Sequence, residues 1–94
     1  MRVGLYPGTF DPITLGHIDV IKKSLKIFDR VVVGTTDSVN KKYYFSIDER
    51  LSIIKNSLFK DLKLNKNKIK VIFFMVELGV NFNKVTKVLQ KNKI

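Results

Sequence analysis

The chain has no cysteine and a single histidine, His17, among its 94 residues. Without cysteine it has no disulfides, thiolate metal sites or cysteine nucleophiles, and one histidine argues against a transition-metal site. No apolar run approaches membrane-spanning length, and the first apolar segment is too short for a signal peptide. The length suits one small domain without a repeat or linker, and we expect the protein to be cytoplasmic.

Acidic residues are scarce, and the net charge is +10. Residues 1–54 hold eight basic and six acidic residues, whereas residues 55–94 hold ten basic and two acidic ones. A basic excess invites a nucleic-acid interpretation. Here the excess is almost all lysine, interleaved with asparagine at 63–68, and lysine lacks the forked contact that arginine makes to base edges. We therefore interpret these lysines as a solvated surface and do not expect nucleic acid as a partner.

Residues 6–17 are the most informative segment and read Tyr-Pro-Gly-Thr-Phe-Asp-Pro-Ile-Thr-Leu-Gly-His. They follow an apolar run at 3–6 that predicts a strand, and they lead into a segment with helical periodicity. A loop with glycine and proline between a strand and a helix N-terminus exposes backbone N–H groups, and the helix dipole adds positive potential there. The pattern therefore predicts a phosphate site with His17 beside it.

Strand and helix patterns alternate along the chain. Apolar, β-branched runs predict strands at 3–6, 31–35 and 69–74. Helical spacing of apolar residues predicts helices at 17–28, from a capping box at 46–49 to residue 58, and at 82–89. The apolar stripes of the first two helices are Ile18, Ile21, Leu25 and Phe28, then Ile47, Leu51, Ile54 and Leu58. This alternation predicts an α/β fold with three parallel strands.

Ligands of such folds bind at the carboxyl ends of the strands, so the loops at 7–16 and 36–45 should face one another. Both loops carry residues suited to phosphate: Gly8, Thr9, Gly16, Lys41 and Lys42. Taken singly, these residues are more typical of a turn or a solvated surface, but together they favour phosphate handling. The defining residues of the P-loop and of the dinucleotide-binding fingerprint are missing from the chain.

Residues 6–17 closely resemble the N-terminal motif of the bacterial phosphopantetheine adenylyltransferases, which belong to the HxGH-type nucleotidyltransferases. Thr14 replaces the first motif histidine, and this Thr-x-Gly-His variant resembles the phosphopantetheine family rather than nicotinamide-mononucleotide adenylyltransferases or cytidylyltransferases. The resemblance continues at Phe28-Asp29, at Lys41-Lys42 and at Asp48-Glu49-Arg50. It is strongest over residues 2–60 and implies a Rossmann-like nucleotidyltransferase fold.

The resemblance implies reversible adenylyl transfer from ATP to 4′-phosphopantetheine, which yields dephospho-coenzyme A and pyrophosphate. It further implies that Thr9 and Phe10 border ATP and that Thr9 also contacts the pantetheine phosphate. His17 would meet the α-phosphate and stabilise the transition state, and Lys41 would help to hold the attacking phosphate and the ATP phosphates. Magnesium is expected on the nucleotide, with no metal ligand from the protein, and a homo-oligomer is expected by analogy with the family.

Residues 74–94 diverge from the family. Its members continue to an Arg-Gly-x-Arg motif and an Ile-Ser-Ser motif, and neither occurs in this sequence. We therefore expect residues 1–94 to form a single incomplete nucleotidyltransferase domain with strongly reduced activity by itself and an exposed apolar sheet edge. The alternatives are another HxGH-type nucleotidyltransferase, a non-catalytic nucleotide-binding remnant and, third, a basic nucleic-acid binder.

Overall fold

Three parallel strands form a sheet in the order β1-β2-β3 within residues 1–37 and 42–75, the parts of the chain that the computed structural model describes. The strands are β1 (Val3–Gly8), β2 (Arg30–Asp37) and β3 (Ile69–Met75). All three predicted strands are confirmed. Each one extends further at its carboxyl end than its apolar run predicted, because backbone pairing continues into polar or glycine-containing residues: Gly8 lies opposite Thr35, and Asp37 lies opposite Met75.

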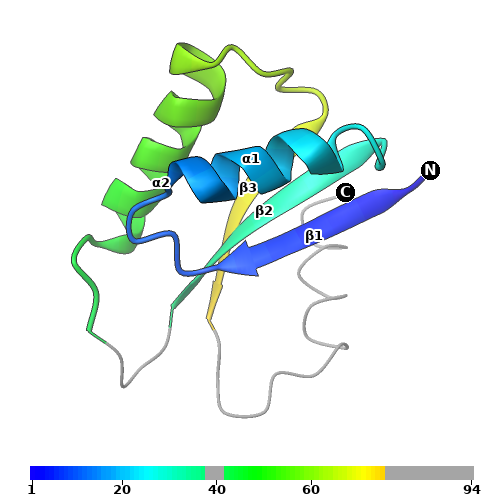
Figure 1. Ribbon diagram of the computed structural model, residues 1–94. Coiled ribbons are helices and arrows are strands. Elements are labelled where there is room, and N and C mark those ends of the chain that lie inside the picture. The colour runs from blue at the N-terminus through cyan, green and yellow to red at the C-terminus, as the bar shows by residue number, and fades with distance from the viewer. Residues whose placement is uncertain (38–41, 76–94) are drawn as a thin grey trace.

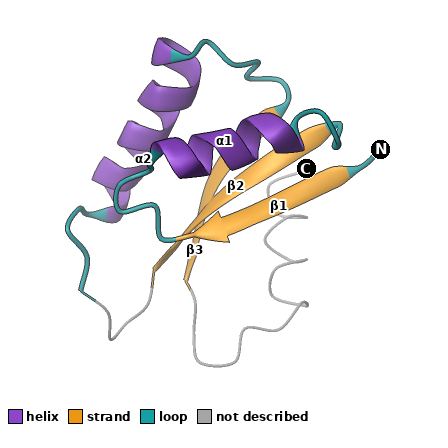
Figure 2. Ribbon diagram, viewed as in Figure 1, coloured by secondary structure: helices purple, strands orange, loops and turns teal. Residues whose placement is uncertain are grey.

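Two helices cover one face of this sheet (Figure 1). Helix α1 (Leu15–Ser24) links β1 to β2, and helix α2 (Ile47–Lys55) continues into a π-helix, η1 (Asn56–Asp61), before β3. Figure 2 shows the helices on the near side of the strands, which is the arrangement that right-handed crossovers in one direction produce. The helix predicted at 82–89 lies outside the described residues.

Helix α1 is shorter than predicted and ends at Ser24 rather than near Phe28. Its last turn tightens, because Lys26 and Ile27 donate their backbone N–H groups to carbonyls three residues back instead of four. The Phe28 side chain then packs against Gly4, where a Cβ would lie 2.7 Å from the Phe28 ring. Residues 25–28, which the apolar spacing placed in the helix, therefore lie beyond its end and lead the chain back to β2.

The core lies between the sheet and the two helices. Val31 and Val33 point to the same face of β2 and belong to one buried cluster with Ile21 of α1 and Ile54 of α2. The remaining buried members of this cluster are Phe10, Ile13, Leu58 and Ile69. The predicted stripe of α1 is thus confirmed as core-facing, because Ile21 is fully buried and Ile18, Leu25 and Phe28 pack against the cluster. The second stripe is confirmed only for Ile54 and Leu58, which are fully buried, whereas Ile53 and Phe59 rather than Ile47 and Leu51 pack against the cluster.

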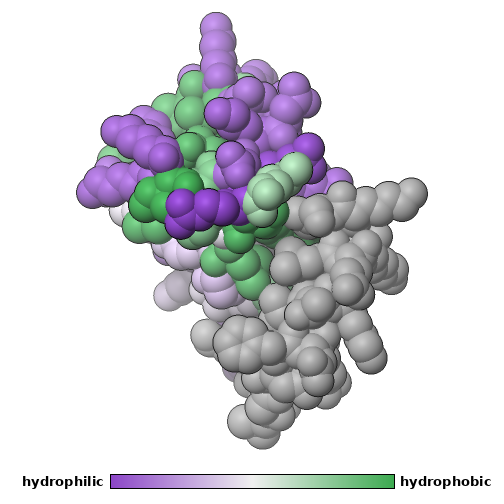
Figure 3. All heavy atoms as spheres, turned by 90° about the vertical axis from the view of Figure 1, so that its right-hand side faces the viewer, coloured by the Kyte–Doolittle hydropathy of each residue, from purple (hydrophilic) through white to green (hydrophobic). Residues whose placement is uncertain are grey.

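Hydrophobic side chains also reach the surface. In the view of Figure 3 they form a green patch bordered by hydrophilic residues. Large exposed hydrophobic residues include Met1, Val3, Val20 and Ile27. Among the described strands β1 lies at an edge of the sheet. Within the same residues, none of the helices has both the length and the apolar character needed to cross a membrane.

Candidate functional site

Helix α1 begins with a reciprocal cap formed by Thr14 and His17. The Thr14 hydroxyl oxygen accepts the backbone N–H of His17 at 3.4 Å, and the Nδ1 atom of the His17 ring accepts the backbone N–H of Thr14 at 2.9 Å. This is the geometry of a capping box, in which a glutamate or glutamine usually takes the place of His17. Because the cap is at Thr14, the helix begins at Leu15, two residues before the predicted start.

This cap leaves the second ring nitrogen of His17 as a donor. A backbone N–H can only donate, so Nδ1 accepts and the proton of the neutral imidazole lies on Nε2. The first bond within α1 runs from the Ile18 N–H to the Thr14 carbonyl at 3.0 Å, so the N–H groups of Leu15 and Gly16 precede the helical ladder. An Nε2–H donor and helix N–H groups that have no acceptor within residues 1–37 and 42–75 therefore occupy one helix N-terminus, which is a favourable site for phosphate.

The His17 ring is held by aromatic contacts. Its centroid lies 4.8 Å from that of Phe10 and 6.1 Å from that of Tyr6, both in edge-type geometry. Phe10 is only 1% exposed and has a φ of 46°, in the left-handed region that costs a non-glycine residue about 1–3 kcal/mol. Since the Phe10 ring belongs to the core, a contact between Phe10 and ATP would have to come from its backbone.

The loop before α1 is fixed through the carbonyl of Thr9. This oxygen accepts the Thr35 hydroxyl at 2.9 Å and the Nη1 atom of Arg50 at 3.1 Å. Gly8 precedes this residue, and a Cβ there would lie 3.2 Å from the Phe10 ring, closer than nine in ten real Cβ contacts. The close fit of Gly8 against Phe10 and the two bonds to Thr9 set the path of the loop.

Arg50 connects the carboxyl ends of two strands with the start of α2. Its side chain is 1% exposed. Its Nε donates to the Phe45 carbonyl at 3.1 Å, and its Nη1 donates to the carbonyls of Thr9 and Thr36 at 3.1 and 2.9 Å. Nη2 forms an ion pair with Asp37 at 3.5 Å, and the guanidinium lies 4.2 Å from the centroid of the Tyr43 ring. One buried cation therefore ties together the backbone on both sides of the predicted cleft.

Asp11 forms a second link between the two loops. Its carboxylate oxygens accept the backbone N–H groups of Tyr44 at 2.6 Å and Phe45 at 2.8 Å. The segment held in this way lines a hollow of about 290 Å³ formed by Lys42, Tyr43 and Tyr44. The prediction that the loops at 7–16 and 36–45 face one another is thus confirmed for their described residues.

The structure describes three of the four predicted site residues. It brings Thr9, Phe10 and His17 together at the carboxyl end of β1, whereas Lys41 lies outside the described residues. Sequence reasoning assigned no role to Arg50 or Asp11. For Arg50 a signal existed, because it stands four residues before Ile54 on the apolar stripe of α2, where a charge must find buried partners.

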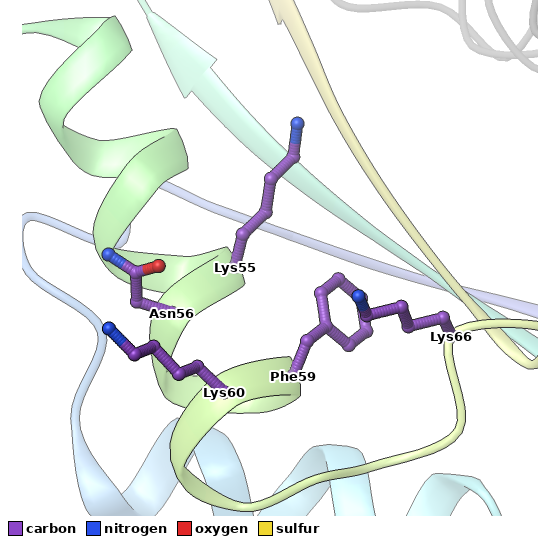
Figure 4. Close-up of a pocket in the computed structure, with 5 residues that line it drawn as sticks. All are labelled: Lys55, Asn56, Phe59, Lys60 and Lys66. Atoms are coloured by element: carbon purple, nitrogen blue, oxygen red, sulfur yellow. The ribbon is translucent and has the colours of Figure 1, made fainter.

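A second hollow, of about 410 Å³, lies at the opposite end of α2 (Figure 4). It is lined by Lys55, Asn56, Phe59, Lys60 and Lys66. The Lys66 ammonium lies over the Phe59 ring at 5.9 Å from its centroid, and all three lysines are exposed. Because helix C-termini lie at the amino ends of the strands in this fold, these lysines are separate from the site at His17. Among the described residues no group of three or more His, Asp or Glu side chains is placed to hold a metal ion.

The segment that holds Thr14, His17 and the strand-to-helix loop is shared with known proteins. The model of the cytidylyltransferase-like family matches residues 5–91. The chain belongs to this family. The match includes the whole of the capped helix and both loops that Arg50 connects.

Curated relatives of this chain carry the name phosphopantetheine adenylyltransferase. The protein of that name from Pelagibacter ubique is 58% identical over 73 residues, which are 78% of this chain and 44% of the relative. The one from Sphingopyxis alaskensis is 52% identical over 58 residues, which are 62% of this chain and 34% of the relative. The chain therefore spans less than half the length of these relatives, and the resemblance found in residues 6–17 is confirmed at the level of the family.

Solved structures confirm the Rossmann-like nucleotidyltransferase fold. A bifunctional NMN adenylyltransferase/ADP ribose pyrophosphatase from Francisella tularensis, complexed with AMP and a manganese ion, aligns with a TM-score of 0.75 and 21% identity over 99% of this chain and 28% of its own. The NadR protein in complex with NAD and AMP-PNP aligns with a TM-score of 0.74 and 20% identity over 97% of this chain and 27% of its own.

Proposed function

We propose that this chain forms the ATP- and phosphate-binding part of a pantetheine-phosphate adenylyltransferase. The reaction is reversible transfer of the adenylyl group from ATP to 4′-phosphopantetheine, with dephospho-coenzyme A and pyrophosphate as products. The family match and the relatives of 52–58% identity support the reaction class. The Thr14 variant of the motif supports 4′-phosphopantetheine as the acceptor.

One observation carries the proposal: the His17 ring is locked at the N-terminus of α1 with its Nε2 as donor. In the reaction, an oxygen of the pantetheine phosphate attacks the α-phosphorus of ATP, and the bond from that phosphorus to the oxygen bridging the β-phosphorus breaks. Negative charge grows on the α-phosphoryl oxygens as this happens. An Nε2–H donor beside the N–H groups of Leu15 and Gly16 stabilises that charge without forming a covalent intermediate.

The substrate supplies the nucleophile in this reaction, so the protein needs only to position the two phosphates and stabilise charge. We assign the α-phosphate of ATP to His17, and the attacking phosphate to Thr9 and Lys41, of which Lys41 also helps to hold the ATP phosphates. Thr9 and Phe10 border the nucleotide, Phe10 through its backbone. We further propose that Mg²⁺ is bound by the phosphates of ATP and neutralises their charge, that the protein is cytoplasmic and that it forms a homo-oligomer.

The test uses the purified 94-residue chain with ATP, Mg²⁺ and 4′-phosphopantetheine. ATP affinity is measured by titration calorimetry, and dephospho-coenzyme A is measured by chromatography. We expect ATP binding, slow product formation, and a further loss of turnover of about 100- to 1000-fold in His17→Ala, the usual effect of removing one transition-state donor. Size-exclusion chromatography with light scattering on the same sample checks the oligomer.

The alternatives predict different results in the same assay. Product formation with nicotinamide mononucleotide but not with 4′-phosphopantetheine would assign the chain to another adenylyltransferase of the superfamily. Equal ATP affinity for the wild type and His17→Ala, with turnover in neither, would favour the non-catalytic nucleotide-binding remnant. Salt-sensitive binding of DNA or RNA that is lost on neutralising Lys63, Lys66, Lys68 and Lys70 would favour the nucleic-acid binder.

A further inference from the structure

We infer that Arg50 is the positioning residue of this site: its buried guanidinium fixes the phosphate loop at Thr9 against the loop that leads into α2. The expected effect on ATP binding rests on the proposed function. The positions of the two loops that Arg50 holds are a property of the ligand-free protein. Arg50 itself is 1% exposed, so it acts through the residues it holds rather than through contact with the nucleotide.

Arg50 donates hydrogen bonds to three backbone carbonyls. Its Nη1 group donates to the carbonyls of Thr9 and Thr36, and its Nε donates to the carbonyl of Phe45. These three carbonyls belong to separate segments: the loop after β1, the carboxyl end of β2 and the residue before the N-cap of α2. Because a guanidinium is planar and rigid, bonds from two of its nitrogens fix the distance and the angle between the segments they reach.

Thr9 is connected to the imidazole of His17 through Phe10. Phe10 follows Thr9 directly, has the positive φ of 46° and packs its ring against the imidazole of His17 at 4.8 Å between centroids. A shift of the Thr9 carbonyl would therefore move Phe10 and change the support of the His17 ring. Interiors are packed closely enough for such a shift to be transmitted.

On the opposite side of the cleft, both Asp11 and Arg50 hold the backbone at Phe45. Asp11, one residue beyond Phe10, accepts the N–H groups of Tyr44 and Phe45, and Arg50 donates to the carbonyl of Phe45. The peptide groups around Phe45 are thus held from both sides, by an anion of the first loop and by a cation of α2. This double attachment fixes the segment that begins at Lys42 relative to His17.

Arginine is required at this position for a geometric reason. A lysine would keep the charge but offers a single ammonium, which cannot span the carbonyls of Thr9, Thr36 and Phe45 in one plane. The Arg50→Lys variant should therefore fold, because the charge keeps Asp37 as a partner, and yet lose the spacing between the loops. If the ion pair with Asp37 were the only interaction at this position, arginine and lysine would be equivalent there.

The experiment compares Arg50→Lys with two controls. Arg30→Lys makes the same substitution at an exposed arginine at the start of β2, and Ile54→Val removes a buried methyl group one turn along α2 from a side chain that cannot hydrogen-bond to the loops. We expect Arg50→Lys to lower the ATP affinity of the folded protein at least tenfold and both controls to stay within twofold of the wild type. Thermal unfolding of all three shows whether Ile54→Val matches the stability loss of Arg50→Lys.

A second readout uses no ligand. In ¹H–¹⁵N NMR spectra of the free proteins, Arg50→Lys should displace the amide resonances of Thr9 and Phe10 and the ring resonances of His17, and Ile54→Val should displace them much less. Unchanged resonances of Thr9, Phe10 and His17 in Arg50→Lys would overturn the inference, as would an ATP affinity within twofold of the wild type. If the wild type fails to bind ATP, the proposed function fails, and the NMR comparison alone decides the role of Arg50.

Discussion

The Nδ1 atom of His17 accepts the backbone N–H of Thr14 at 2.9 Å, so the cap of helix α1 also determines which ring nitrogen faces a ligand. The Thr14 hydroxyl lies 3.1 Å from the same nitrogen. In HxGH-type motifs the position of Thr14 is a histidine, and here a threonine caps the helix and orients the remaining histidine at the same time. Threonine is a good N-cap because its hydroxyl oxygen accepts an N–H of the first turn.

The first prediction concerns the tautomer of His17. Because Nδ1 is an acceptor, we expect the neutral ring to carry its proton on Nε2. Long-range ¹H–¹⁵N correlation NMR distinguishes a protonated from an unprotonated ring nitrogen directly, and the only histidine of the chain makes the assignment unambiguous. A ring protonated on Nδ1 in the neutral form would contradict the cap geometry.

The second prediction separates the stabilising and orienting effects of Thr14. Thr14→Ala and Ser46→Ala remove the N-cap hydroxyls of α1 and α2, which stand in equivalent capping boxes. Each change should lower the free energy of unfolding by about 1 kcal/mol. Only Thr14→Ala should shift the ring resonances of His17, because only this cap contacts the imidazole. Denaturant unfolding and NMR on both variants check the pair, and equal shifts in both would refute the orienting role.

These residues also show how much of the site could be predicted from the sequence. The strands, the capping box at Ser46 and the strand-to-helix passage within residues 6–17 are local patterns, and the structure confirms them. The place of Arg50 on the apolar stripe of α2 signals a buried charge, but its three backbone carbonyl partners lie up to 41 residues away along the chain, so the local pattern does not identify them. The burial of Phe10 is a tertiary effect as well, because its positive φ turns the ring from the loop into the core.

The third prediction concerns Gly16. Among the described residues, a Cβ at Gly16 meets only the Thr14 hydroxyl oxygen, at 3.7 Å, so this part of the fold has room for alanine. Alanine is the better helix former, and Gly16→Ala should raise the free energy of unfolding by up to about 1 kcal/mol. Side chains point toward the helix N-terminus, so the new methyl group would stand where the phosphate is expected. We therefore expect higher stability with weaker ATP binding, measured by denaturant unfolding and calorimetry. Tighter or unchanged binding would mean that the phosphate does not approach this turn.

The fourth prediction tests Lys41, whose role rests on the family resemblance. Lys41→Gln should weaken ATP binding by about 10- to 100-fold, the effect of losing one hydrogen bond to a charged group. Lys60→Gln removes the same charge from the exposed cluster at the far end of α2 (Figure 4) and serves as the control. At physiological ionic strength charges beyond about 8 Å are largely screened, so Lys60→Gln should bind ATP as the wild type does. Equal losses in both variants would show that ATP responds to net charge alone, and the assignment of Lys41 to the phosphate site would then fall.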